Sequence, residues 1–204
     1  AQGKAAPKID AGEVLTRALG RGDAGERKLI VEVATAYGAG QVLRAAASDT
    51  DPGVRLVAAL SVRGADAAVV LRAAALDPEA DIRARAVAAV PGAGLPPADA
   101  VALLEPALVD PDPQVAGAAL RALATVQGQG ARIKAELEIA MASDREWRRA
   151  AAAEAARALA EHDPAAATPL LDRAVRDPAR DVRRIAIPAL AALRAKATPL
   201  ATLA

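Results

Sequence analysis

The chain has 204 residues, of which 60 are alanine, and it contains one Trp, one Tyr, one Met and neither Phe nor Cys. Its 26 Lys and Arg residues nearly balance its 25 Asp and Glu residues, and a formal net charge of +1 does not fit a polybasic nucleic-acid or membrane-surface protein. The lack of Cys excludes disulfides, thiolate metal sites and a cysteine nucleophile, and the single histidine, His162, excludes a site that needs two imidazoles.

The alanine content predicts thin helical layers. Alanine has the highest intrinsic helix propensity, but its small side chain fills a core only where backbones approach closely. No apolar stretch approaches the roughly 18 residues of a transmembrane helix. We therefore expect no membrane association. The sequence favours a cytoplasmic protein, with a periplasmic or secreted one as the alternative if Ala1 is a mature N-terminus.

Five segments of the chain align with one another, after a diverged first unit that runs from Leu15 through Arg27 to Ala34. Each segment reads as a short apolar helix, a turn containing Asp or Asp-Pro, a bulky residue usually followed by Arg, and an alanine-rich helix. The segments cover residues 43–62, 71–90, 104–123, 137–159 and 171–193, and their bulky residues are Val54, Ile82, Val115, Trp147 and Val182. A two-helix repeat every 28 to 35 residues predicts an α-solenoid.

Asp and Pro residues mark the predicted helix boundaries. Asp51 and Asp112, each followed by Pro, are expected N-caps of second helices, and Asp144 is expected to cap without a Pro. Residues 91–97 (PGAGLPP) predict a loop between the third and fourth units. Pro188 is expected to kink the last helix or to end it early. Residues 1–9 read as an N-terminal tail, and residues 198–204 as a tail or the start of a further repeat.

The pattern resembles the HEAT-like repeats of bacterial and archaeal proteins, in the short form also seen in phycobilin lyase subunits. The resemblance is carried by Asp51-Pro52, Val54-Arg55 and Ala58-Ala59, and an aliphatic residue followed by Arg recurs at Ile82-Arg83 and Val182-Arg183. It covers residues 10–197 and departs from the repeat pattern at Ala116 and Trp147. It implies a single all-α domain, a right-handed α-solenoid of about six two-helix HEAT-like repeats.

The repeated arginines are predicted to form a structural ladder, consisting of Arg27, Arg55, Arg83, Arg148 and Arg183. Their regularity, and an equal supply of aspartates at the turns, favour bidentate pairing with Asp49, Asp77, Asp110 and Asp177. The HEAT-like resemblance implies the same role. The alternative is a track of guanidinium groups that binds phosphates.

Candidate partner-binding residues lie on the predicted second helices, which are expected to line a concave face: Leu56, Val57, Leu60, Arg85, Arg149 and Arg184. The leucines and valine form a predicted apolar strip, and packing against a neighbouring repeat is the equal alternative. Trp147 is predicted to fill the core, with an exposed anchor for a partner as the alternative.

No catalytic motif is present: the chain lacks G-x-S-x-G, a P-loop and G-x-G-x-x-G. The expected function is a non-catalytic module that binds a protein or peptide on its concave face, with no cofactor and no metal. The alternative is nucleic-acid binding through the arginines of the C-terminal repeats, which are Arg148, Arg149, Arg180, Arg183 and Arg184.

Overall fold

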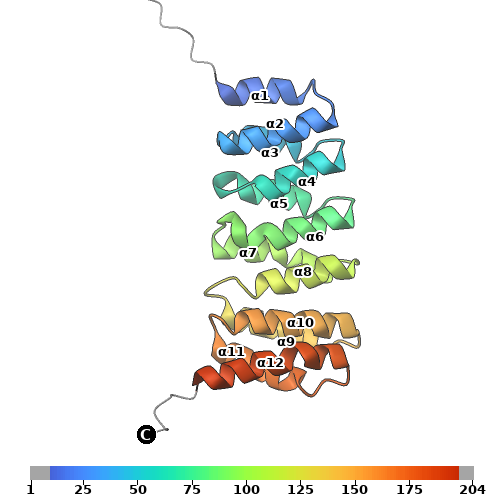
Figure 1. Ribbon diagram of the computed structural model, residues 1–204, viewed down its shortest axis with the longest axis vertical. Coiled ribbons are helices and arrows are strands. Elements are labelled where there is room, and N and C mark those ends of the chain that lie inside the picture. Colours follow the sequence, from blue (N-terminus) through green and yellow to red (C-terminus); the bar gives the residue numbers. More distant parts are fainter. Residues whose placement is uncertain (1–9, 198–204) are drawn as a thin grey trace, which may run out of the picture.

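The computed structural model describes residues 10–197, and these residues form twelve α-helices and three short 3-10 helices, without a strand. The predicted tail at 1–9 and the predicted tail or further repeat at 198–204 lie outside the described residues. Figure 1 shows the helices stacked along the length of the molecule, with α1 at one end and α11 and α12 at the other. The predicted all-α solenoid is confirmed.

The helices pair into six units, each a first helix followed by a second helix. The first helices are α1 (Ala11–Leu19), α3 (Gly40–Ala46), α5 (Ala67–Ala74), α7 (Pro97–Leu104), α9 (Gly130–Met141) and α11 (Pro164–Ala174). The second helices are α2 (Ala24–Ala36), α4 (Pro52–Ser61), α6 (Ala80–Ala89), α8 (Pro113–Leu123), α10 (Glu146–Leu159) and α12 (Arg180–Ala197). The 3-10 helices are η1 (Gly64–Asp66), η2 (Val90–Ala93) and η3 (Pro106–Val109).

Each second helix packs against its own first helix and against the second helix of the next unit, so the second helices form a continuous layer from α2 to α12. Alanine dominates the buried face of this layer, most clearly in α10, which buries Ala151, Ala152, Ala153, Ala155 and Ala156. Such small side chains let neighbouring helices approach closely, as the composition predicts. The hydrophobic core is therefore thin, and it continues along the whole stack of helices.

Most predicted boundaries match the observed helices. Asp51 and Asp112 are N-caps that accept backbone N–H groups, each with Pro at the first helical position. The prediction for Asp144 is wrong, because α10 begins one residue later, after Arg145, and has no side-chain cap. The loop predicted at 91–97 overlaps η2, which begins at Val90 and which Gly94 ends in a left-handed conformation with φ 75°, and Pro97 already begins α7. Helix α12 continues through Pro188 to Ala197, so the proline does not end it early.

Candidate protein-interaction site

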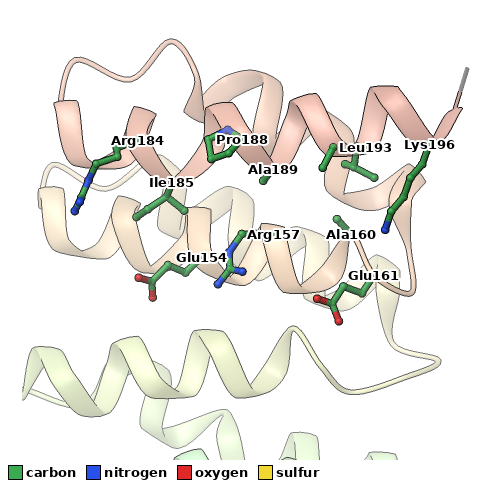
Figure 2. Close-up of a pocket in the computed structure, with 11 residues that line it drawn as sticks. Glu154, Arg157, Ala160, Glu161, Arg184, Ile185, Pro188, Ala189, Leu193 and Lys196 are labelled. Carbon is green, nitrogen blue, oxygen red and sulfur yellow. The ribbon is translucent and has the colours of Figure 1, made fainter.

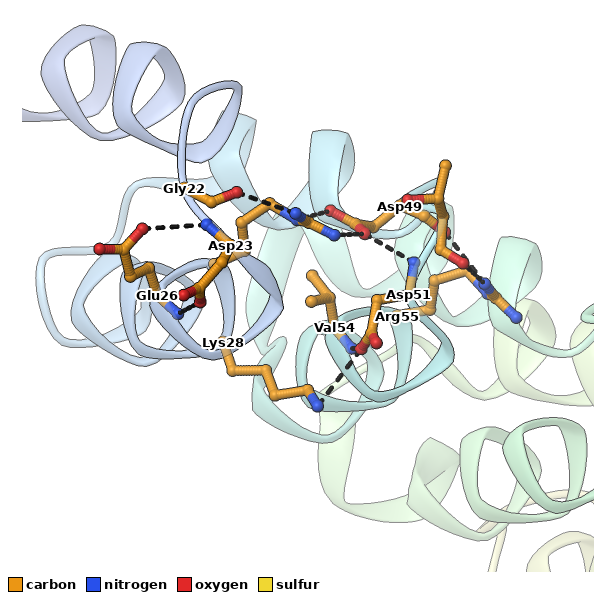
Figure 3. Close-up of polar contacts among 10 residues, drawn as sticks. Gly22, Asp23, Glu26, Lys28, Asp49, Asp51, Val54 and Arg55 are labelled. Atoms are coloured by element: carbon orange, nitrogen blue, oxygen red, sulfur yellow. Dashed lines mark hydrogen bonds and ion pairs between the residues drawn. The ribbon is translucent and has the colours of Figure 1, made fainter.

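An arginine ladder joins successive units at the turns before the second helices, and Figure 3 shows its first steps, around Asp49 and Arg55. The fourth residue of a second helix is Arg in five of the six described units. Arg55 illustrates the geometry: its Nη1 donates to the Asp49 and Thr50 carbonyls of its own turn, at 3.0 and 3.2 Å. Its Nε and Nη2 donate to both carboxylate oxygens of Asp77 in the next unit, at 2.6 and 3.0 Å.

Three further pairs repeat this bidentate contact. They are Arg27–Asp49 at 2.8 and 2.8 Å, Arg83–Asp110 at 2.9 and 3.0 Å, and Arg149–Asp177 at 2.8 and 3.1 Å. Each aspartate lies three residues before a second helix and also accepts the backbone N–H two residues further on. The ladder therefore holds the turn between the two helices of a unit and also the position of the next unit relative to it.

The ladder environment lowers the pKa of every aspartate in it. Burial acts to raise the pKa of Asp77, but the hydrogen bonds from Arg55 and from the Glu79 N–H outweigh burial, and the net pKa is lowered. For Asp110 and Asp177 the largest effect is the hydrogen bond from the paired arginine, which lowers the pKa. These carboxylates are held ionised, which suits a structural role and not proton transfer.

In α10 the ladder residue is Arg149, not Arg148 as the sequence alignment predicts. Arg148 is the third residue of its helix, at the position that Val54 and Ile82 hold in other units, and its Nε is buried without a hydrogen-bond partner. Trp147 is accordingly the second residue of α10 and does not replace an aliphatic core residue. It is half-buried on the outer side of the second-helix layer.

The predicted partner-binding residues do not form one patch. Leu56 and Val57 are half-buried against the core, and Leu60 is 40% exposed. Two of the predicted arginines lie beside acidic residues of their own helices: Arg85 is 3.0 Å from Asp81, and Arg184 is 3.6 Å from Asp181. With Arg149 in the ladder, only Arg184 of the predicted set lies in the groove described next.

Two hollows open on the second-helix layer near the C-terminal end. A hollow of about 430 Å³ lies between α8 and α10, where Trp147 stands beside Gln114 and Gly117. A second hollow of about 510 Å³ lies between α10 and α12, where Ile185 and Pro188 form part of an apolar wall (Figure 2). Glu154 lines both hollows. The two hollows lie on either side of α10, and we call the pair the α8–α12 groove.

The charges that line the groove are predominantly basic. The acidic lining residues are Glu154 and Glu161, and the basic ones are Arg121, Arg157, Arg184 and Lys196. Arg121 donates to Glu154 at 3.2 Å, whereas Arg157 and Lys196 have no ion-pair partner within residues 10–197. The groove thus offers an apolar surface flanked by cations, which suits an acidic segment with apolar side chains.

The groove was not predicted from the sequence, because Trp147 was expected to fill the core. The available indication was the register: counting from Arg149 as the ladder residue puts Trp147 at the same helix position as Gln114, on the outer row of the second helices.

Two further properties bear on function. Within the described part of the chain, no three His, Cys, Asp or Glu side chains come together in a way that could hold a metal ion. No described helix combines the length and the apolar character needed to cross a membrane.

Comparison with known structures supports the fold and no more. No protein-family model and no curated protein sequence matches the chain. An engineered protein solved by the Northeast Structural Genomics Consortium is 19% identical with a TM-score of 0.53, and the match covers 92% of this chain and 98% of that one. A designed armadillo repeat protein is 17% identical with a TM-score of 0.54, with 90% and 100% covered. The chain is thus similar to engineered helical repeat scaffolds.

Proposed function

We propose that this helical repeat protein is a non-catalytic scaffold of the HEAT-like type, which binds a protein or peptide segment on its second-helix layer, at the α8–α12 groove. The observation that carries the proposal is this pair of hollows. One is lined by the half-buried Trp147, and the other by Arg157 and Lys196, two cations without ion-pair partners among the described residues. Tryptophan is enriched at the energetic centres of protein interfaces. Leu60, exposed on α4, extends the same layer toward the N-terminal units.

The charge of the groove supports an acidic partner segment. Arg157 and Lys196 would each gain an ion pair on binding without breaking one within the described residues. A protein partner is favoured over nucleic acid because Arg149 is bonded on both sides in the ladder and Nη1 of Arg183 donates to two turn carbonyls. Only one aromatic residue, Trp147, lies in the groove, whereas single-strand binding usually uses several stacking platforms.

The test captures partners from a lysate of the native host with the full chain as bait, at two salt concentrations. The variants Trp147→Ala and Arg157→Glu change the groove, and Arg173→Glu, an exposed arginine on α11, is the matched control. We expect one protein in near-stoichiometric amount with the wild type and the control, bound at least about tenfold more weakly by Trp147→Ala.

Two other outcomes would overturn the proposal. Undiminished capture by both groove variants would remove the groove as the binding site. Recovery of nucleic acid that washes off at the higher salt, without such a protein, would favour the nucleic-acid alternative.

A further inference from the structure

The arginine ladder continues to the last helix that the structure describes. Arg183, the fourth residue of α12, donates from Nη1 to the Asp177 and Pro178 carbonyls, both at 2.6 Å. This is the contact that Arg55, Arg83 and Arg149 make with their own turns. In those three arginines, Nε and Nη2 then pair with an aspartate of the next unit. No carboxylate within residues 10–197 accepts from Nε or Nη2 of Arg183.

An apolar residue is exposed one helical turn beyond Arg183. Ile187 is the eighth residue of α12 and is 55% exposed. The eighth residue is apolar in every second helix and at most 1% exposed in the other five, where it is Val31, Ala59, Val87, Leu120 or Ala153. Residues four apart lie on the same face of a helix. Arg183 and Ile187 therefore lie on one face of α12, at the two positions that carry a ladder arginine and a buried apolar residue in α2, α4, α6 and α10.

No aspartate of the described residues fills the position opposite Nε and Nη2 of Arg183. Residues 198–204 (TPLATLA) contain no acidic side chain. In a second copy of the chain, the first unit carries Arg21 at the position three residues before its second helix, where the ladder aspartates lie in later units. Head-to-tail stacking of two copies would therefore bring Arg21 toward Arg183, which like charges disfavour.

We propose that the α11–α12 end of the solenoid is a docking surface for a further two-helix repeat of the same kind, one that carries an aspartate three residues before its second helix. That aspartate accepts from Nε and Nη2 of Arg183, and the apolar face of the docked repeat covers Ile187. The surface is separate from the α8–α12 groove and does not depend on the function proposed there.

The test extends residues 1–197 with a second copy of residues 163–197, so that Asp163 caps the added first helix as it caps α11. The added unit brings its own copy of Asp177 to the ladder position opposite the original Arg183. We expect a single cooperative unfolding transition with a higher denaturant midpoint and a larger m-value than the chain of residues 1–197, since more surface is buried. We also expect the Nε–H resonance of the original Arg183 to become protected from exchange.

Two matched variants of the added copy separate the effect of the ladder contact from that of the rest of the added unit. Asp177→Asn in the added copy is expected to lose the protection at Arg183 and much of the gain in midpoint. Asp181→Asn, the same change at an exposed site of the added copy, is expected to retain both. An added unit that gives no increase in helix content or m-value would overturn the proposal. So would an Asp177→Asn copy whose midpoint and Arg183 protection equal those of the unaltered copy.

Discussion

Each ladder arginine uses its planar guanidinium on both sides of a repeat boundary. Nη1 of Arg55 donates to the carbonyls of the turn before its helix, and Nε and Nη2 donate to the carboxylate of Asp77 in the following unit. Lysine has a single charged nitrogen without a fixed planar geometry and cannot reproduce this fork. The pair is largely shielded from water, with side-chain exposures of 13% for Arg55 and 3% for Asp77.

Replacing Asp77 by Asn tests the contribution of one ladder pair to stability. Asn retains the size of the side chain but loses the charge and one acceptor, and Arg55 keeps its partly buried charge. We expect the free energy of unfolding to fall by about 2 kcal/mol, measured by urea denaturation. Asp81→Asn is the control, because Asp81 pairs with Arg85 in the open and such pairs contribute about 0.5 kcal/mol or less. Equal effects of the two variants would contradict a special role for the ladder.

The lowered pKa values of the ladder aspartates predict how stability depends on pH. Because Asp49, Asp77, Asp110 and Asp177 have folded-state pKa values below the unfolded value of about 3.9, the unfolded chain binds more protons at low pH. Their contribution is therefore complete above pH about 5 and is lost as the pH falls through the folded pKa values. We expect the melting temperature to be nearly constant from pH 7 to about 5 and to drop below about 4.

The Asp77→Asn variant provides the internal check on this pH dependence. One ladder site no longer titrates in the variant, so its melting temperature should fall less steeply between pH about 4 and 2 than that of the wild type. Parallel curves for the two proteins would show that the acid sensitivity arises elsewhere.

The one-residue error at α10 shows where reasoning from the sequence fails. The pattern of a bulky residue followed by Arg fits both Trp147-Arg148 and Arg148-Arg149, and the bulk of tryptophan favours the wrong choice. The helix start decides the register, and α10 lacks the Asp-Pro boundary that fixes α4 and α8. The ladder at Arg55 and Arg83 was predictable, because each of these arginines stands six residues after a turn aspartate.

Among the helices, the junction between α8 and α10 differs from the others because both ladder partners are absent. Ala116 is the fourth residue of α8, and Ser143 lies three residues before α10. Because both the arginine and the aspartate of the ladder are absent at this junction, neither charge is left there without its partner. Two ion pairs span the same step instead, Arg121 with Glu154 and Arg132 with Glu105. The helices also come close, since a Cβ on Gly117 would lie 3.6 Å from Cβ of Ala151.

The groove could not be derived from the sequence because it depends on how the second helices are rotated. The sequence alone assigns Leu56, Val57 and Leu60 to an apolar strip, but burial of Leu56 and Val57 against the core leaves mainly Leu60 outside. The α8–α12 groove arises where small residues, Gly117 and Ala150, leave room beside larger ones. Periodicity identifies the helices and their buried faces, but it does not measure the gaps between outer side chains.

Pro188 lies inside α12, where it costs the helix a backbone donor and crowds the carbonyl of Arg184. We expect Pro188→Ala to raise the free energy of unfolding by about 2 kcal/mol, measured by urea denaturation. Pro164→Ala is the control, because Pro164 is the first residue of α11, where no backbone donor is needed. A gain of similar size at both positions would contradict the explanation. Pro188 also lines the hollow between α10 and α12.

At the scale of the whole molecule, the repeat architecture was predictable almost completely. The alternation of alanine-rich helices with Asp-Pro turns specifies six units from the first helix to Ala197, and each unit buries its surface mainly against its neighbours. Stability in such a stack is a sum of units and interfaces, so the two ends differ from every internal unit. The N-terminal end exposes Val14 and Leu29 beside Arg17 and Arg21, and the other end exposes Ile187 beside Arg183.

Arg21 lies three residues before α2, where later units carry the ladder aspartate, and its charge disfavours stacking of the first unit of a second copy on Arg183. Replacing Arg21 by Asp gives the first unit the carboxylate that later units carry, at the same distance before the second helix. We expect Arg21→Asp to associate in a concentration-dependent manner in sedimentation velocity at low salt, where the wild type does not. The double variant Arg21→Asp, Arg183→Gln should return to wild-type behaviour, because the new aspartate then has no guanidinium to accept from. Wild-type association equal to that of Arg21→Asp, or association that persists in the double variant, would show that charge at these two positions does not control stacking.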